Sequence, residues 1–99
     1  MTQLSKSQIK FLKAEAHALK PVVMIGGNGV TESVLEELER ALDHHELIKI
    51  KVRAEDRDEK HEIIEYLCEK TNAIKVNTIG HNLVLFRQSK DKKILLPKK

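Results

Sequence analysis

Several residue types are scarce in this chain of 99 residues. It has one cysteine, Cys68, which excludes an internal disulfide and a multi-thiolate metal site and favours a reducing, cytoplasmic location. Tryptophan is missing, and the aromatic residues are limited to Phe11, Tyr66 and Phe86. The chain therefore cannot build the rows of stacked aromatic side chains on which several RNA-binding folds depend.

Long apolar runs are missing as well. The longest, residues 22–25 and 83–86, are far shorter than the roughly 20 residues of a membrane helix. Residues 1–7 contain no apolar segment typical of a signal peptide. Hydrophobic residues make up 40% and charged residues 33%, which fits a folded soluble domain. No linker, repeat or low-complexity segment divides residues 1–99, so we expect one domain and no membrane partner.

Charge is unevenly distributed along the chain, whose net charge is +3. Residues 1–30 carry a net charge of +3, residues 31–62 carry −5, and residues 63–99 carry +5. An uneven basic surface is typical of proteins that bind a polyanion such as nucleic acid, although ordinary solubility is an alternative explanation. The end of the chain, about 88–99, is a basic tail, and we expect its apolar run Ile94-Leu95-Leu96 to dock back onto the domain.

The hydrophobic pattern predicts three helices and four strands. A capping box at Ser5 and Gln8 begins the first helix, which Pro21 ends. The continuous apolar run 22–25 predicts a strand buried on both faces, in the middle of a sheet. The remaining elements, in order, are a helix capped by Thr31 and ending at 44–46, a strand at 47–54, a helix from 55–58 to Asn72, and strands at 73–79 and 83–87.

This order of elements, α-β-α-β-α-β-β, defines the expected fold. Strand–helix–strand units form right-handed crossovers with parallel strands, and the last two strands form an antiparallel hairpin. We therefore predict a two-layer α/β fold with a mixed four-stranded sheet and helices on one face. The other face is expected to be partly open and to display Lys49, Lys51 and Arg53, which alternate with apolar residues along 47–54.

A glycine-rich loop, Gly26-Gly27-Asn28-Gly29, lies between the first strand and the second helix. Glycine removes the Cβ atoms that would keep a sugar-phosphate backbone away, and free N–H groups at a helix start can meet a phosphate. KH domains clamp nucleotides with a loop of this kind. A plain tight turn is the alternative. The loop lacks the lysine of a triphosphate-binding loop and the spacing of a dinucleotide-binding loop.

Attraction for phosphate must come from elsewhere, because Glu32 and Glu36 lie near the loop. Lysines of the first helix, together with His17, fall within an arc of roughly 80° and form a cationic ridge. This ridge would supply the attraction if it packs beside the loop, although exposed lysines are often merely solvated. Its lysines are Lys6, Lys10, Lys13 and Lys20.

Catalytic and metal sites are not indicated. No two of the five histidines have the i, i+4 spacing of a helical metal site. Cys68 lies on an apolar helix stripe, and no nucleophile–base pattern is visible. We therefore predict no metal, no cofactor, no small-molecule substrate and no enzymatic activity.

The segments 19–34, 41–52 and 79–87 resemble the CRM domain family, named for chloroplast RNA splicing and ribosome maturation. They read LKPVVMIGGNGVTESV, ALDHHELIKIKV and IGHNLVLFR. The resemblance implies a fold similar to the C-terminal domain of translation initiation factor three, and RNA binding without catalysis. Bacterial members of the family associate with precursors of the large ribosomal subunit. Two positions depart from the family pattern: Gly27 supplies no charge, and Phe86 stands where tyrosine is frequent.

We therefore predict an RNA-binding module that assists assembly of the large ribosomal subunit, with large-subunit rRNA as its partner. The predicted RNA-binding residues are Gly26, Gly27, Asn28, Gly29, Lys10, Lys13, Lys20, Lys49, Lys51 and Arg53. The alternative is a protein-interaction module that docks on a ribosomal protein through residues 31–62 or through the tail.

Overall fold

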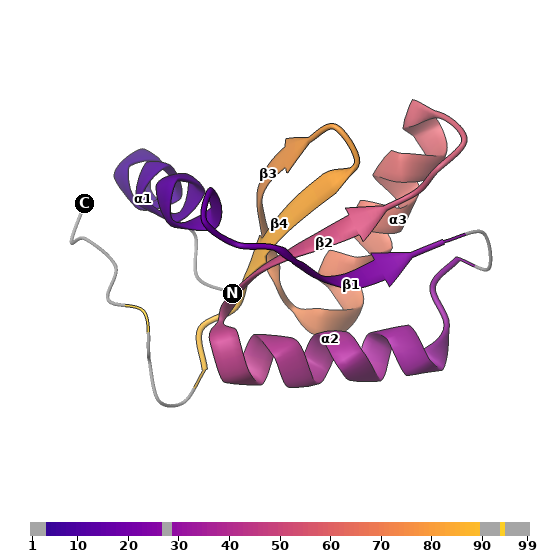
Figure 1. The fold of residues 1–99 in the computed structure, drawn as a ribbon, viewed down its shortest axis with the longest axis horizontal. Coiled ribbons are helices and arrows are strands. Elements are labelled where there is room, and N and C mark those ends of the chain that lie inside the picture. Colours follow the sequence, from indigo (N-terminus) through magenta and orange to yellow (C-terminus); the bar gives the residue numbers. More distant parts are fainter. Residues whose placement is uncertain (1–3, 27–28, 90–93, 95–99) are drawn as a thin grey trace.

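Seven elements follow one another in the predicted order in the computed structural model, which describes residues 4–26, 29–89 and 94 (Figure 1). They are helix α1 (Lys6–Ala16), strand β1 (Pro21–Ile25), helix α2 (Glu32–His45), strand β2 (Leu47–Val52), helix α3 (Arg57–Thr71), strand β3 (Ile74–Ile79) and strand β4 (Asn82–Phe86). The mixed α/β class and the element order are confirmed, and strand ends differ from the prediction by one or two residues.

The helix ends follow from local chemistry. Ser5 and Gln8 form the expected capping box, with Ser5 Oγ accepting from the Gln8 N–H at 3.2 Å and Gln8 Oε1 accepting from the Ser5 N–H at 2.9 Å. The Thr31 hydroxyl caps α2 by accepting from the Val34 N–H at 3.2 Å. Asn72 ends α3 in the left-handed conformation, with φ of 60°.

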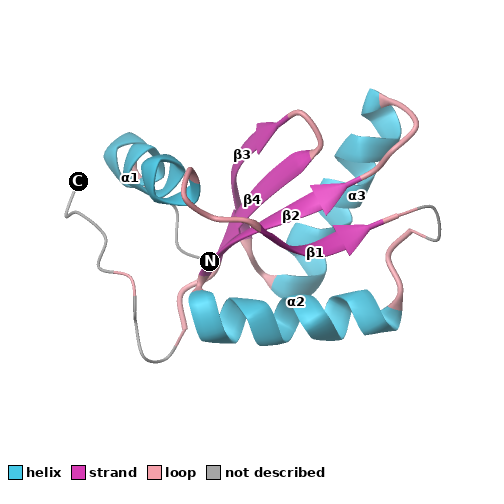
Figure 2. Ribbon diagram, in the orientation of Figure 1, coloured by secondary structure: helices cyan, strands magenta, loops and turns pink. Residues whose placement is uncertain are grey.

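The sheet has the strand order β1-β2-β4-β3 (Figure 2). Strands β1 and β2 pair in parallel, as a strand–helix–strand crossover requires. Strand β4 is antiparallel to both of its neighbours, β2 and β3. The crossover through α3 therefore leaves room for one strand between β2 and β3, and the hairpin folds β4 back into that place.

Strand β1 lies at an edge of the sheet, so the prediction of a central strand buried on both faces is wrong. Its Val23 and Ile25 are buried, whereas Val22 and Met24 are 48% and 58% exposed. A continuous apolar run does not distinguish a strand covered on both faces from an edge strand with one face in solvent. The strands with neighbours on both sides are β2 and β4, although the alternating sequence of β2 indicated a half-buried position.

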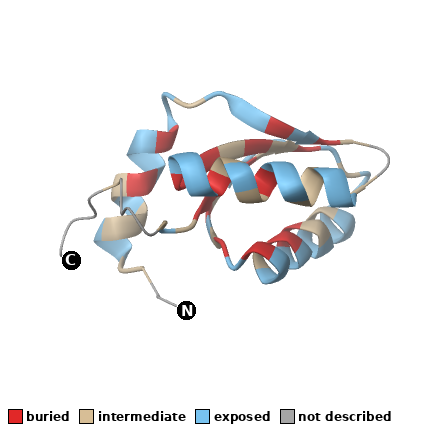
Figure 3. Ribbon diagram, turned by 90° about the horizontal axis from the view of Figure 1, so that it is seen from below, coloured by how far each residue is buried: buried red, intermediate tan, exposed pale blue. Residues whose placement is uncertain are grey.

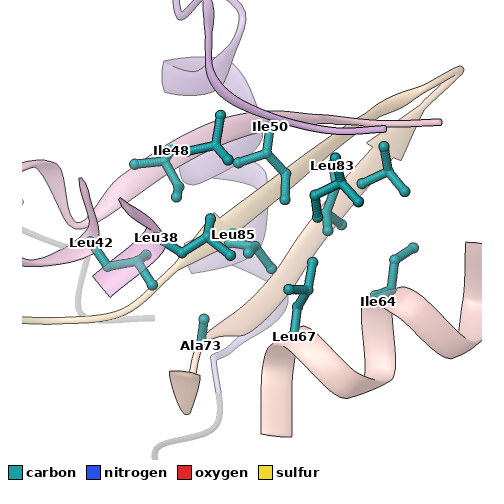
Figure 4. Packing of buried hydrophobic residues seen from close by; sticks show 12 residues of the cluster. Leu38, Leu42, Ile48, Ile50, Ile64, Leu67, Ala73, Leu83 and Leu85 are labelled. Carbon is teal, nitrogen blue, oxygen red and sulfur yellow. The ribbon is translucent and has the colours of Figure 1, made fainter. Parts of the chain in front are cut away.

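The main core lies between one face of the sheet and helices α2 and α3 (Figure 4). Leu38 and Leu42 of α2 and Leu67 of α3 pack there against Ile48 and Ile50 of β2. The outward surface of α2 is largely exposed, while buried residues concentrate in the sheet behind it (Figure 3). This face of the sheet is thus covered by helices, as predicted, but by two of the three.

Helix α1 packs on the opposite face and forms a partial third layer. Its Leu12 and Ala16 share a second apolar cluster with Leu47, Val84 and Phe86. These strand residues alternate with the residues of the main core, so they point to the other side of the sheet. The second face is therefore covered at one end and open at the other.

The chain after β4 is fastened to the domain by a buried carboxylate. Glu46 follows α2 with φ of 63° and has no exposed surface. Its carboxylate accepts hydrogen bonds from the Ser89 N–H at 2.9 Å, from the Ser89 hydroxyl and from the Ile94 N–H at 2.8 Å. Ile94 packs against the α1 cluster, as expected, and Leu95 and Leu96 lie outside the described residues.

Candidate nucleic-acid interface

Three connections meet at one end of the sheet. The Arg53 N–H donates to the Ile25 carbonyl at 2.9 Å, which places Arg53 beside Gly26. The Val52 N–H donates to the His81 carbonyl at 2.7 Å, which holds the β3–β4 turn against the end of β2. This end of the sheet thereby brings together the start of the glycine-rich loop and two exposed residues, Arg53 and His81.

The glycine-rich loop leaves space next to its main chain. A Cβ atom added at Gly26 or at Gly29 would meet no atom within 4 Å. Gly29 has a φ of 72°, which favours glycine, and its N–H donates to the Gly26 carbonyl at 3.0 Å. The Gly29 amide is therefore hydrogen-bonded within the chain, and its contact with a phosphate stays a prediction. Gly27 and Asn28 lie outside the described residues.

The lysine ridge does not pack beside this loop. Helix α1 lies at the opposite end of the longest axis from the end of β1, in a molecule that extends 39 Å (Figure 1). Lys10 and Lys13 are exposed there. The reason is the docking of α1, which packs against Leu47 and Phe86, the strand residues furthest from the loop. The expectation that ridge and loop form one compact site is wrong.

Strand β2 connects the two ends. Lys49 and Lys51 point to the same face as α1, because they alternate with Ile48 and Ile50 of the main core. Residues two apart on a strand are separated by about 6.6 Å. A line of cations thus runs from α1 to the end of the sheet, and we call it the basic track: Lys20, Lys49, Lys51 and Arg53.

A hollow of about 390 Å³ lies at the α1 end of the basic track. Lys20 and Lys49 both line it, so the two cations border the same space. Its walls come from the end of α1 and the first residues of β1 and β2, with Leu19, Val22 and Leu47 among the apolar lining. Glu15 contributes a carboxylate.

Carboxylates are concentrated on the other side of the molecule. None of the four strands contains an aspartate or glutamate. Helices α2 and α3 together carry ten carboxylates against four Lys and Arg residues, whereas α1 carries three lysines and Glu15. The face that bears the basic track is therefore far more favourable for a polyanion than the face that bears α2 and α3.

His81 and Lys60 were not among the predicted site residues. Lys60 reaches the β3–β4 turn, where its ammonium group donates to the Gly80 carbonyl. The sequence placed His81 in a turn, but it carried no signal that this turn abuts the end of β2. A pairing between residues 52 and 81 is a tertiary contact.

Within residues 4–26, 29–89 and 94, no three metal-ligating side chains come together. The helices among these residues fall short of the length and hydrophobicity that a membrane span requires.

Burial raises the pKa of the Cys68 thiol, while the positive charge and the backbone of Lys75 act in the opposite direction. Cys68 packs against the main core.

The fold and this interface define a mixed α/β domain with a glycine-rich loop at the end of its first strand. The chain belongs to the CRS1/YhbY (CRM) domain family, whose model matches residues 4–87. It is 58% identical to a Haemophilus influenzae protein named RNA-binding protein, over the full length of both chains. The predicted family resemblance is therefore confirmed.

Two further proteins are similar to this chain. A Pseudomonas aeruginosa protein named a probable RNA-binding protein is 41% identical, over 87% of this chain and 83% of that protein. A Staphylococcus aureus protein with a known solution structure has a TM-score of 0.82 and 35% identity. The similarity covers 96% of this chain and all of that one, so the two proteins share the whole architecture.

Proposed function

We propose that this chain binds RNA through the face that bears the basic track, and that its target is RNA in precursors of the large ribosomal subunit. The observation that carries the proposal is the separation of charge between the two faces of the sheet. A phosphate backbone laid along β2 meets Lys49 and Lys51 and no strand carboxylate. Family membership and the names of the relatives support RNA as the polyanion.

The glycine-rich loop extends this footprint beyond Arg53. The open space at Gly26 lets a sugar-phosphate backbone lie against the main chain, and Arg53 supplies positive charge beside it. Lys10 and Lys13 act from the far end of the molecule, as long-range attraction for a larger RNA. The footprint is therefore elongated, which suits a structured RNA better than a single nucleotide.

The proposal is tested by measuring affinity for a structured ribosomal RNA fragment across a salt series. Each lysine that neutralises a phosphate contributes about one unit to the slope of log affinity against log salt. Lys49→Gln and Lys51→Gln are expected to lower the slope by about one each. Lys70→Gln, an exposed lysine on α3, is the matched control and leaves the slope unchanged. Equal slopes for all three variants would contradict the proposal.

The loop is tested separately with Gly26→Ala. The added methyl group enters open space and introduces no unfavourable φ, so stability is unchanged. Affinity for the RNA is expected to fall about threefold, because the methyl group occupies the space that the nucleotide backbone needs. Wild-type affinity in this variant would show that the RNA does not approach the main chain here.

The target is tested in cells by crosslinking, with sequencing of the RNA that is recovered. Enrichment of large-subunit rRNA from immature particles supports the proposed target. Docking on a ribosomal protein is the second candidate function, and the ten carboxylates of α2 and α3 favour it by attracting a basic protein. That function predicts that charge-neutralising changes on α2 abolish ribosome association while Lys49→Gln and Lys51→Gln leave it intact.

A further inference from the structure

The open part of the sheet face beside α1 carries a row of residues that crosses all four strands. Met24 pairs with Lys51, Lys51 with Asn82, and Asn82 with Ile79. We call these four residues the open-face row. They point to the α1 side, because their strand neighbours Ile50 and Leu83 belong to the main core.

The ends of the open-face row are apolar and exposed. Met24 is 58% exposed and Ile79 is 49% exposed, whereas Lys51 and Asn82 between them are half-buried. Three strand spacings separate the two ends, about 14 Å in all. Val22, 48% exposed, extends the apolar surface along β1 toward the hollow beside α1. Large exposed apolar side chains gathered on one sheet face are typical of a contact surface.

The composition of the row favours nucleotides over a protein segment as its occupant. Exposed apolar side chains at the two ends of a Lys51–Asn82 pair suit bases and their phosphates, since a phosphate meets the ammonium group while the bases cover the apolar side chains. The Asn82 amide both donates and accepts hydrogen bonds, as base edges require. A methionine thioether also makes favourable contacts with aromatic rings. The row crosses the basic track at Lys51, so it adjoins the path assigned to the RNA backbone.

We propose that the open-face row contacts unpaired bases of the bound RNA, through Met24 and Ile79 on base faces and Asn82 on base edges. The inference rests on the proposed RNA-binding function and adds the class of RNA that this face selects. Bases in a duplex are stacked and cannot cover the row, whereas bases in a loop or bulge can be splayed out. The chain thereby obtains base contacts without a row of stacked aromatic side chains.

The first test compares two synthetic RNAs, a hairpin with an unpaired loop of mixed sequence and a duplex of equal phosphate number. Wild type is expected to prefer the hairpin. The double variant Met24→Ser, Ile79→Ser is expected to bind the hairpin about tenfold more weakly and the duplex unchanged, with the same salt slope. Tyr66→Ser is the matched control, because Tyr66 is 42% exposed on α3, and it alters neither affinity.

The second measurement needs no variant and uses the methyl resonances of Met24 and Ile79 in the wild-type protein. Aromatic ring currents shift a methyl group that lies over a base, so the hairpin is expected to move both resonances upfield. Inorganic polyphosphate, which supplies charge without bases, is expected to leave them in place. This comparison decides the proposal even where the double variant fails to fold.

The outcomes separate this inference from the function on which it rests. Equal binding of hairpin and duplex, with methyl resonances that do not move, overturns the base contact and leaves RNA binding intact. Failure of the wild type to bind either RNA, at any salt, overturns both. Methyl shifts with an acidic peptide that match those with the hairpin would assign the row to a protein partner and would also overturn the inference.

Discussion

The two faces of the sheet differ in both packing and charge. The face under α2 and α3 holds the main core and is backed by two helices rich in carboxylates. The face under α1 holds a smaller cluster at one end, and its strands expose lysines and apolar side chains at the other. We infer that the first face supplies most of the stability, and the second carries the proposed binding surface.

The comparison also shows where a charge count along the chain misleads. Residues 31–62 have a net charge of −5, yet they contain Lys49, Lys51 and Arg53, three of the four members of the basic track. Strand β2 comes between the acidic helices α2 and α3 in the sequence. Its lysines point to the face of the sheet opposite to the face that these two helices cover. The charge of each face of the sheet therefore comes from several segments of the chain and cannot be found by counting charges along the sequence.

The largest expected change in stability is that of Arg87→Ala, on the face that α2 and α3 cover. The Arg87 guanidinium donates to the Glu39 carboxylate at 2.8 Å, to the Asp43 carboxylate at 2.9 Å and to the Thr71 carbonyl at 2.8 Å. It thereby ties β4 to α2 and α3. Its loss is expected to cost about 3 kcal/mol of the free energy of unfolding, measured with urea. RNA affinity of the folded variant is unchanged.

Arg40→Ala is the control for that experiment, because Arg40 is exposed on α2. Its effect is expected to stay within about 0.5 kcal/mol. A loss of RNA affinity in Arg87→Ala at temperatures where it is folded would mean that the two faces do not act separately.

A second, smaller effect is expected at the Glu46 carboxylate, which holds the chain after β4. Glu46→Ala removes the acceptor of the Ser89 and Ile94 hydrogen bonds and is expected to cost about 2 kcal/mol, or roughly 10 °C in Tm. Glu46→Gly is expected to be about 1 kcal/mol more stable than Glu46→Ala, since glycine tolerates the φ of 63°. Calorimetry of both variants separates the carboxylate from the backbone, and equal Tm values would contradict the assignment.

The α1 end of the basic face is tested by Lys10→Gln, Lys13→Gln. We expect RNA affinity at low salt to fall about tenfold and the salt slope to fall by at most about two, because two cations that attract the RNA are lost. Both side chains are exposed, so the urea midpoint stays unchanged. Wild-type affinity in this double variant would show that the RNA footprint does not extend beyond Lys20 onto α1 and that binding is confined to the sheet.

The smallest expected effect concerns the Cys68 thiol, which lies on the α3 side. Burial raises the pKa of Cys68, so the neutral thiol persists to higher pH than in an exposed cysteine. Alkylation at neutral pH is expected to be slower than for the unfolded chain, and its pH profile moves upward. Lys75→Ala raises the pKa further, because the Lys75 charge favours the thiolate. A thiol that reacts as fast folded as unfolded would contradict this.

The same shift predicts a small pH dependence of stability. Below the ordinary thiol pKa both the folded and the unfolded chain are protonated at Cys68, and the contribution to stability is complete. As pH rises above that value, the unfolded chain loses its proton first, so stability declines. Urea midpoints of wild type and Cys68→Ala across this range check the sign, because the decline is absent from the variant.

The element order and the helix caps could be predicted because their causes are local. Ser5 and Thr31 satisfy N–H groups three residues away, and Asn72 tolerates a left-handed backbone that ends a helix. The fold class then follows from the handedness of crossovers and from the terminal hairpin. The family motif could be found for the same reason, since it lies within continuous segments.

The candidate site could be predicted only in part, because it depends on which strand lies next to which. The alternation in β2 predicted the outward lysines, but nothing local showed that β1 lies at the edge of the sheet. The meeting of Arg53, Gly26 and His81 depends on backbone hydrogen bonds between segments far apart in the sequence. The separation of the α1 lysines from the loop depends on where Leu12 finds apolar partners.

The helices, the strands, their order and the family to which the chain belongs could all be predicted from the amino-acid sequence. These depend on periodicity, capping and turn chemistry over a few residues. Three features depend on tertiary packing: α1 occupies the second face, β1 is exposed at the edge, and the basic residues form one elongated surface. The physical reason is that burial of apolar area is shared among all elements at once, so the position of each helix depends on the surface that the others leave uncovered.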